Sequence, residues 1–187
     1  MADFLTGKLL VATPKITEQV FRRSVVIVLH HDAQGAHGLI LNKPLGVGVD
    51  AVLPGWSAHL TSPAVMFQGG PVGLDTAFGL GWDTGNEDET ATGGVQRVVG
   101  SIGVVNLDGE PGWIRARTEG VRVFVGYSGW SSGQLESEVA AHSWYVVDAQ
   151  SIDAFTQAPH ELWRTVLRRQ PGRLSWVASF PDDPERN

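Results

Sequence analysis

Side chains suited to chemistry gather in one glycine-rich stretch, which follows an alternating apolar strand and leads into a polar helix start. Two aromatic residues could wall a pocket, and an amide and a carboxylate four residues apart would share one helix face. These residues are Tyr127, Trp130, Gln134 and Glu138. Such a pocket would bind a small ligand or a partner. In the alternative of a small-molecule enzyme, Glu138 or Glu136 would be the base, and Asn42 and Gln134 would orient the substrate.

Two further strand exits carry residues suited to unusual backbone angles. Asn42 precedes Lys43-Pro44, and Gly69-Gly70 ends an apolar strand. Because ligands of α/β sheets bind outside strand ends, we expect both exits to lie close to the 126–138 stretch and to form one site with it. A structural role is the open alternative, in which Asn42 bonds its own turn, Trp130 anchors the core and the glycines allow close packing.

Three more specific chemistries are disfavoured. Ser128 lies between a strand and a helix, as in a nucleophile elbow, but Trp130 replaces the second glycine that the elbow needs for its tight turn. His30, Asp32 and His37 could converge across a hairpin as zinc ligands, although such residues beside a turn are more often simply hydrated. A double glycine without a following lysine and hydroxyl is too short to cradle a phosphate. We therefore assign no catalytic residues, no metal ligands and no cofactor.

The composition limits the partners and the location that we expect. The chain has 187 residues, 42% of them hydrophobic, with a net charge of −6 and no cysteine. One domain spanning residues 1–187 can bury a substantial core. Direct nucleic-acid binding is disfavoured, because an acidic chain lacks the basic face that neutralises phosphates. No secretory signal pattern and no apolar run near the ~20 residues of a membrane span are present, which predicts a cytoplasmic protein. The oligomeric state does not follow from the sequence.

Hydrophobic periodicity predicts an alternation of strands and helices. Strands are expected at 8–12, 24–30, 37–42, 65–68, 76–82, 95–99, 102–107, 121–127 and 144–147, and helices at 47–53, 132–141, 152–155 and 161–169. Ser131 and Gln134 have the spacing of a capping box at the start of the second helix. The acidic segment from Asp83 to Gly94 has little apolar surface to bury, so we expect a mobile loop there. The predicted core includes Val25, Ile27, Leu29, Leu39, Leu41, Val123, Val125 and Leu135.

Several blocks of sequence, taken together and in their order, resemble the YqgE/AlgH family of bacterial proteins. The blocks are Gly7-Lys8-Leu9-Leu10, Phe21-Arg22-Arg23-Ser24-Val25, Gly35 to Pro44, Gln68-Gly69-Gly70-Pro71-Val72, and Gly126 to Glu138 with Trp144 beyond. The resemblance implies an α/β fold, a single compact domain with a mixed, largely antiparallel and bifurcated β-sheet flanked by helices. It brings no established catalytic residues, and the family's label of transcriptional regulator is a further functional alternative. Our first interpretation is a non-enzymatic binding or regulatory protein that acts through a partner or a small ligand at Tyr127 and Trp130.

Overall fold

The computed structural model describes residues 4–85 and 94–182. The strands are β1 (Lys8–Ala12), β2 (Val25–Asp32), β3 (Gly35–Ile40), β4 (Pro44–Gly48), β5 (Val65–Gln68), β6 (Val72–Asp83), β7 (Val95–Val99), β8 (Ile102–Val105), β9 (Thr118–Ser131) and β10 (Trp144–Asp148). The α-helices are α1 (Pro111–Arg117), α2 (Gln134–Ala140), α3 (Ser151–Ala154), α4 (Leu162–Arg168) and α5 (Leu174–Val177), and the 3-10 turns are η1 (Val49–Ala51), η2 (Ser57–His59) and η4 (Pro159–Glu161). None of these helices is long and apolar enough to cross a membrane.

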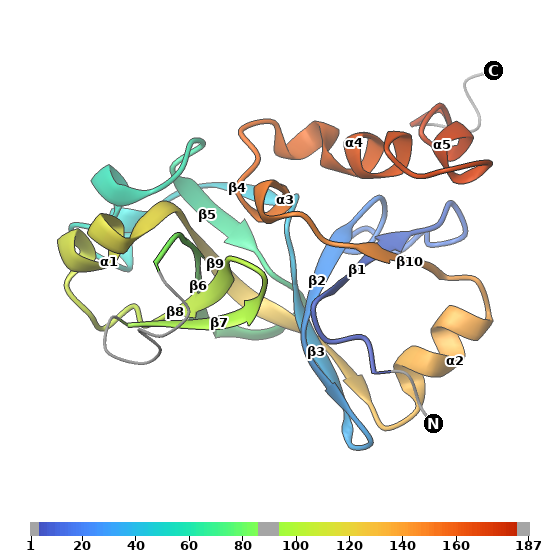
Figure 1. Cartoon of the computed structure of the whole chain (residues 1–187), viewed down its shortest axis with the longest axis horizontal. Helices are drawn as coiled ribbons and strands as arrows, with labels where there is room; N and C mark the ends of the chain where they lie inside the picture. The colour runs from blue at the N-terminus through green and yellow to red at the C-terminus, as the bar shows by residue number, and fades with distance from the viewer. Residues whose placement is uncertain (1–3, 86–93, 183–187) are drawn as a thin grey trace.

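The sheet divides at its longest strand, β9. The strand order is β10-β1-β2-β3-β9-β6-β8-β7, with β5 pairing with β9 and β4 pairing with β5. The last residues of β9, 128–131, pair with β3, whereas its earlier part pairs with β6 and β5. Among the strand pairs in the described part of the chain, only β5–β9 is parallel, so the sheet is mixed and largely antiparallel. Figure 1 shows β9 passing from the strands beside α1 to the strands beside α2. The expected fold class is confirmed.

Alternating side chains on the central strands supply the core on both sides of the sheet. Val25 and Ile27 of β2 pack into one cluster, which α4 covers with Trp163 among others. Val26 and Val28 point to the opposite face and join a second cluster that α2 covers. The β-branched run of β2 is therefore buried on both faces, as its sequence predicts. A third cluster, around α1, fills the other half of the molecule.

The predicted core is largely confirmed. Six of its residues have no exposed surface: Val25, Ile27, Leu39, Leu41, Val123 and Leu135. Leu29 and Val125 are only partly buried and pack against the edges of core clusters. For Leu29 the reason is local, because its side chain lines an open cleft between the two halves of the sheet.

Three expectations about elements need correction, and a fourth falls largely outside the described residues. The predicted helix at 47–53 is the end of β4 followed by the 3-10 turn η1, because pairing of β4 with β5 overrides the local pattern. Helix α1 was not predicted, although a proline in its first turn is a typical start signal. Asp83 belongs to β6, is buried and pairs with Arg97 at 3.1 Å, so it is not part of a loop. Residues 86–93 of the predicted mobile loop lie outside the described residues.

The largest correction concerns the strand predicted at 121–127, which does not end at Tyr127. β9 runs through it to Ser131. Gly126 has a φ of 70°, which favours glycine, and the β6–β9 register shifts between Val72 and Ala77. The glycine therefore allows an irregularity inside a long strand, where the sequence predicted a sharp turn into a helix. Ser128 is accordingly buried within β9 and donates to the carbonyl oxygen of Gly69 at 3.0 Å, so no nucleophile elbow exists there.

Candidate functional site

The predicted pair Gln134 and Glu138 forms a hydrogen-bonded clamp. One carboxylate oxygen of Glu138 accepts the indole N–H of Trp130 at 2.9 Å and that of Trp144 at 2.8 Å. The other oxygen accepts from the side-chain amide of Gln134 at 2.9 Å. The clamp therefore joins α2 to β9 and β10, and its carboxylate already holds three donors.

The start of α2 keeps half of the predicted capping box. The backbone N–H of Ser131 donates to the side-chain oxygen of Gln134 at 3.0 Å, as a capping box requires. The Ser131 hydroxyl, however, donates to the same oxygen and caps no backbone N–H, because Gly133 in the left-handed region is the N-cap. Both ends of the Gln134 amide are thus used within the fold.

Asn42 holds the entry to β2. Its side-chain oxygen accepts from the backbone N–H of Val25 at 2.9 Å, and its side-chain nitrogen donates to the backbone carbonyl of Arg23 at 2.8 Å. Asn42 is buried, and Arg23 has a φ of 53°, a left-handed conformation that few non-glycine residues adopt. The amide therefore fixes the carbonyl of this unusual residue and the first backbone N–H of β2.

Gly69 and Gly70 lie against β9 at the point where the sheet divides. A Cβ atom on Gly70 would meet the carbonyl carbon and oxygen of Tyr127 at 2.1 Å, and one on Gly69 would meet the carbonyl oxygen of Gly126 at 2.4 Å. The carbonyl of Gly69 also accepts from the backbone N–H of Ile40 at 2.8 Å. These glycines allow the close approach of backbones that the division of the sheet demands.

The structure thus brings some of the predicted residues together and separates others. Gly69-Gly70 contacts 126–128. The backbone carbonyl of Lys43, next to Asn42, accepts a hydrogen bond from the backbone N–H of Gln68 at 2.8 Å. Gln134 and Glu138 follow the far end of β9 and do not line the clefts described next.

Tyr127 lines a cleft between the two halves of the sheet, which we call the Tyr127 cleft. Its volume is about 570 Å³. It is lined mostly by apolar side chains: Leu29, Leu39, Phe78, Val98 and Val104, with His30, His37, Gln96 and Tyr127 as the polar ones. The Phe78 and Tyr127 rings meet edge to face with centroids 5.9 Å apart. Because it lies where the strands diverge, no strand pairing fills it.

A shallower hollow of about 480 Å³ continues the Tyr127 cleft toward the β2–β3 turn. The two share His30, His37 and Tyr127, and Trp130 lines the hollow. The His37 ring and the Tyr127 hydroxyl make no hydrogen bond to the described residues, so both are available to a ligand. Partial burial against the cleft lowers the pKa of His37, and the neighbouring charge of His30 lowers it further.

His30, Asp32 and His37, which the sequence analysis considered as zinc ligands, are not arranged as a metal site. His30 pairs with Asp32 at 2.9 Å, and the centroids of the His30 and His37 rings are 5.5 Å apart. Among the described residues, no three His, Asp or Glu side chains are placed to hold a metal ion. His31 points to the other face of β2, where it contacts Glu136 at 3.1 Å.

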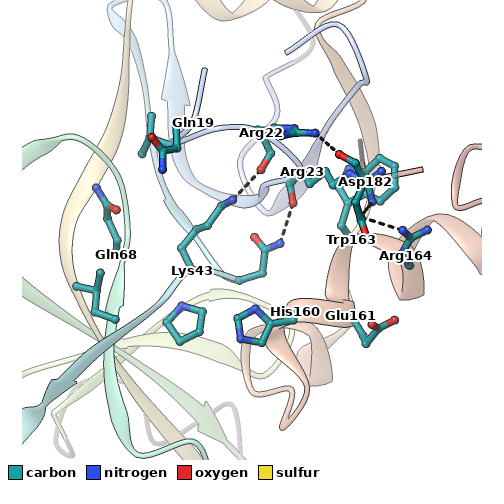
Figure 2. A pocket seen from close by; sticks show the side chains of 14 residues that line it. Gln19, Arg22, Arg23, Lys43, Gln68, His160, Glu161, Trp163, Arg164 and Asp182 are labelled. Atoms are coloured by element: carbon teal, nitrogen blue, oxygen red, sulfur yellow. Dashed lines mark hydrogen bonds and ion pairs between the residues drawn. The ribbon is translucent and has the colours of Figure 1, made fainter. Parts of the chain in front are cut away.

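A second cleft, which the sequence did not predict, lies between the β2 entry, the β3–β4 connection and α4. We call it the Lys43 cleft, and Figure 2 shows its lining. Its volume is about 820 Å³, and its charged residues are Arg22, Arg23, Lys43, Glu161, Arg164 and Asp182. Asn42 and Gln68 also line it. The basic pairs were visible in the sequence, but some 140 residues separate Arg23 from Arg164, and only the seating of α4 on the sheet brings them together.

Comparisons with known proteins agree with this architecture. Residues 9–175 match the family model described as AlgH-like (DUF179). The chain is 45% identical to a UPF0301 protein of Streptomyces avermitilis and equally to one of Streptomyces coelicolor, over 98% of this chain and 95% of each relative. The chain therefore belongs to the AlgH-like, UPF0301 family. The expected family membership is confirmed.

Two solved structures share the fold. A crystal structure of a protein from Corynebacterium diphtheriae superposes with a TM-score of 0.88 at 30% identity, covering 94% of this chain and 92% of that one. The solution structure of AlgH from Pseudomonas aeruginosa gives a TM-score of 0.68 at 26% identity, covering 98% and 97%. This chain therefore shares its overall fold with both solved structures.

Proposed function

We propose that this protein is a non-enzymatic binding protein that takes a small, largely apolar ligand in the Tyr127 cleft. The observation that carries the proposal is an apolar cleft in which the His37 ring and the Tyr127 hydroxyl have no hydrogen-bond partner among the described residues. Its volume of about 570 Å³ falls within the roughly 300–1,000 Å³ typical of small-molecule sites. The apolar walls would supply affinity, and the two polar groups would orient a ligand that carries one hydrogen-bonding group.

The geometry supports binding better than carboxylate catalysis. A general base must face the substrate, yet the Glu138 carboxylate accepts three hydrogen bonds inside the clamp. Asn42 is the residue expected to orient a substrate, but its side-chain oxygen and nitrogen both form hydrogen bonds with backbone groups. The regulator alternative would act through the bound ligand or a partner, since the acidic chain favours indirect over direct contact with DNA. The proposal includes a cytoplasmic location, which cell fractionation tests.

The test is a ligand screen read residue by residue. Amide and indole NMR signals of the protein are followed while small heteroaromatic compounds are added. We expect hits to shift signals of Leu29, Phe78, Val104 and Tyr127 in a saturable way. Val98→Trp should abolish these shifts, because the added ring fills the cleft. Val52→Trp is the matched control, since Val52 is exposed at 57% and lies outside the cleft. Hits that bind Val98→Trp as well as the natural protein would refute the proposal.

A further inference from the structure

The second cleft carries an inference that is independent of the first. Its lining contains four cations, namely Arg22, Arg23, Lys43 and Arg164, but only two carboxylates, Glu161 and Asp182. The whole chain has a net charge of −6. A concave region with an excess of positive charge on an acidic protein focuses the local field on small anions.

One contact within the chain shows that these cations can bind a carboxylate. The carboxylate of Asp182, beyond α5, lies between the guanidinium groups of Arg23 and Arg164, with 3.0 Å to Arg164. Arg22 donates to the backbone carbonyl of the same residue. Figure 2 shows these contacts at one side of the cleft. The Asp182 side chain stays 80% exposed, so little apolar burial holds it there.

The two arginines, in contrast, are held firmly. Their side chains are only about one-fifth exposed, at 22% for Arg23 and 20% for Arg164. The Arg23 guanidinium stacks on the ring of Trp163 at 4.5 Å from its centroid, and Asn42 fixes the backbone of Arg23. Arginines whose orientation is set by other contacts form a preorganised anion site, because little side-chain freedom remains to be lost on binding.

Lys43 adds a cation without an acidic partner. Its ammonium group donates to the backbone carbonyl of Arg22 at 2.7 Å and contacts no carboxylate of the described residues. Burial lowers the pKa of Lys43, and the charge of Arg22 lowers it further. An anion bound in the cleft would relieve this unfavourable environment.

We propose that the Lys43 cleft is a binding site for a small carboxylate- or phosphate-bearing molecule, and that the carboxylate of Asp182 occupies part of it as an internal competitor. The anionic group of the ligand displaces Asp182 from Arg23 and Arg164 and reaches Lys43. Binding therefore frees the Asp182 side chain, whereas the backbone carbonyls of Phe180 and Pro181 keep their hydrogen bonds from Arg23. A small molecule fits better than a nucleic acid, because the basic residues line a cleft of about 820 Å³ and the chain as a whole is acidic.

Citrate and inorganic phosphate are the probes, titrated separately at an ionic strength kept constant with sodium chloride. NMR signals of the Trp163 indole and of Phe180 to Asp182 report occupancy and release. We expect saturable shifts with at least one probe, and the stronger of the two identifies the carboxylate or phosphate source. Asp182→Asn should tighten binding about two- to five-fold, the range expected for removal of a largely exposed ionic competitor.

Matched variants distinguish binding of the anion in the Lys43 cleft from nonspecific screening of surface charges. Arg164→Gln should weaken binding about ten-fold, because a charge-assisted hydrogen bond is lost, while Arg168→Gln, exposed on the same helix, should leave it unchanged. Lys43→Met provides a second loss-of-binding variant should Arg164→Gln unfold. Three results would overturn the proposal: no saturable shift in the natural protein or in Asp182→Asn, equal effects of the two arginine variants, or binding of a short DNA duplex with no response to either probe.

Discussion

The indole nitrogen of Trp130 donates to the carboxylate of Glu138 across a distance of 2.9 Å, and this bond ties the end of β9 to the middle of α2. Trp144 donates to the same oxygen, so one carboxylate joins two strands and a helix. Trp130 and Glu138, which the sequence suggests as the wall of a pocket, therefore also connect secondary-structure elements. The difference has measurable consequences.

The first prediction concerns this joint. Glu138→Ala should lower the free energy of unfolding by about 1–3 kcal/mol, because two largely buried indole N–H groups lose their acceptor. Gln134→Ala, on the exposed side of the clamp, should cost no more than about 0.5–1 kcal/mol. Urea denaturation measures both values. Equal and negligible effects would mean that the carboxylate is only a solvated surface group.

The second prediction concerns the close approach of the backbones beside β9. Gly70→Ala should destabilise the protein by about 3 kcal/mol or more, because the added Cβ would lie 2.1 Å from backbone atoms of Tyr127, which cannot move aside easily. Gly46→Ala is the control. A Cβ there meets nothing within 4 Å, so a change within about 0.5 kcal/mol is expected. A stable, natively folded Gly70→Ala variant would contradict this account of the division of the sheet.

The third prediction concerns pH and the Tyr127 cleft. The pKa of His37 lies below its ordinary value of 6.5 in the folded protein, so the folded state disfavours protonation. The unfolded chain then binds the proton first as the pH falls. The contribution of His37 to stability is therefore complete above about pH 6.5 and is lost as the pH falls through the folded-state pKa.

NMR titration of the imidazole signals checks this sign directly. His30→Gln should raise the pKa of His37, because it removes the charge that disfavours protonation, and Asp32→Asn should lower it. His37→Gln should flatten the dependence of stability on pH below about pH 6.5, the ordinary pKa of a histidine. A His37 pKa above 6.5 would show that the ring is not held against the cleft.

The fourth prediction concerns DNA. The purified protein should bind duplex DNA neither tightly nor with sequence specificity, because its net charge is −6 and its basic residues in the Lys43 cleft are partly neutralised by Asp182. Fluorescence anisotropy with labelled duplexes at several salt concentrations measures this. Tight binding that weakens steeply with added salt would contradict the prediction and favour the regulator alternative.

Much of the fold could be predicted from local sequence because local and global preferences agree. The run from Val25 to Val28 is β-branched and buried on both faces, and Leu135 fixes the inward face of α2. Where local preference and the global fold conflict, the pairing between strands decides the structure. Val47 looks helical in its local context, yet β4 pairs with β5 there, and Gly126 looks like a turn but lies inside β9.

The candidate sites divide in the same way. The sequence by itself determined the family, the fold class and most of the core, since these depend on residue types and on spacing along one element. Only the tertiary structure decided that Tyr127 meets His37 in a cleft, and that Arg23 and Arg164 share a single carboxylate. Such contacts join residues far apart in the chain. They depend on how the strands diverge and where α4 packs, and local periodicity carries no information about either.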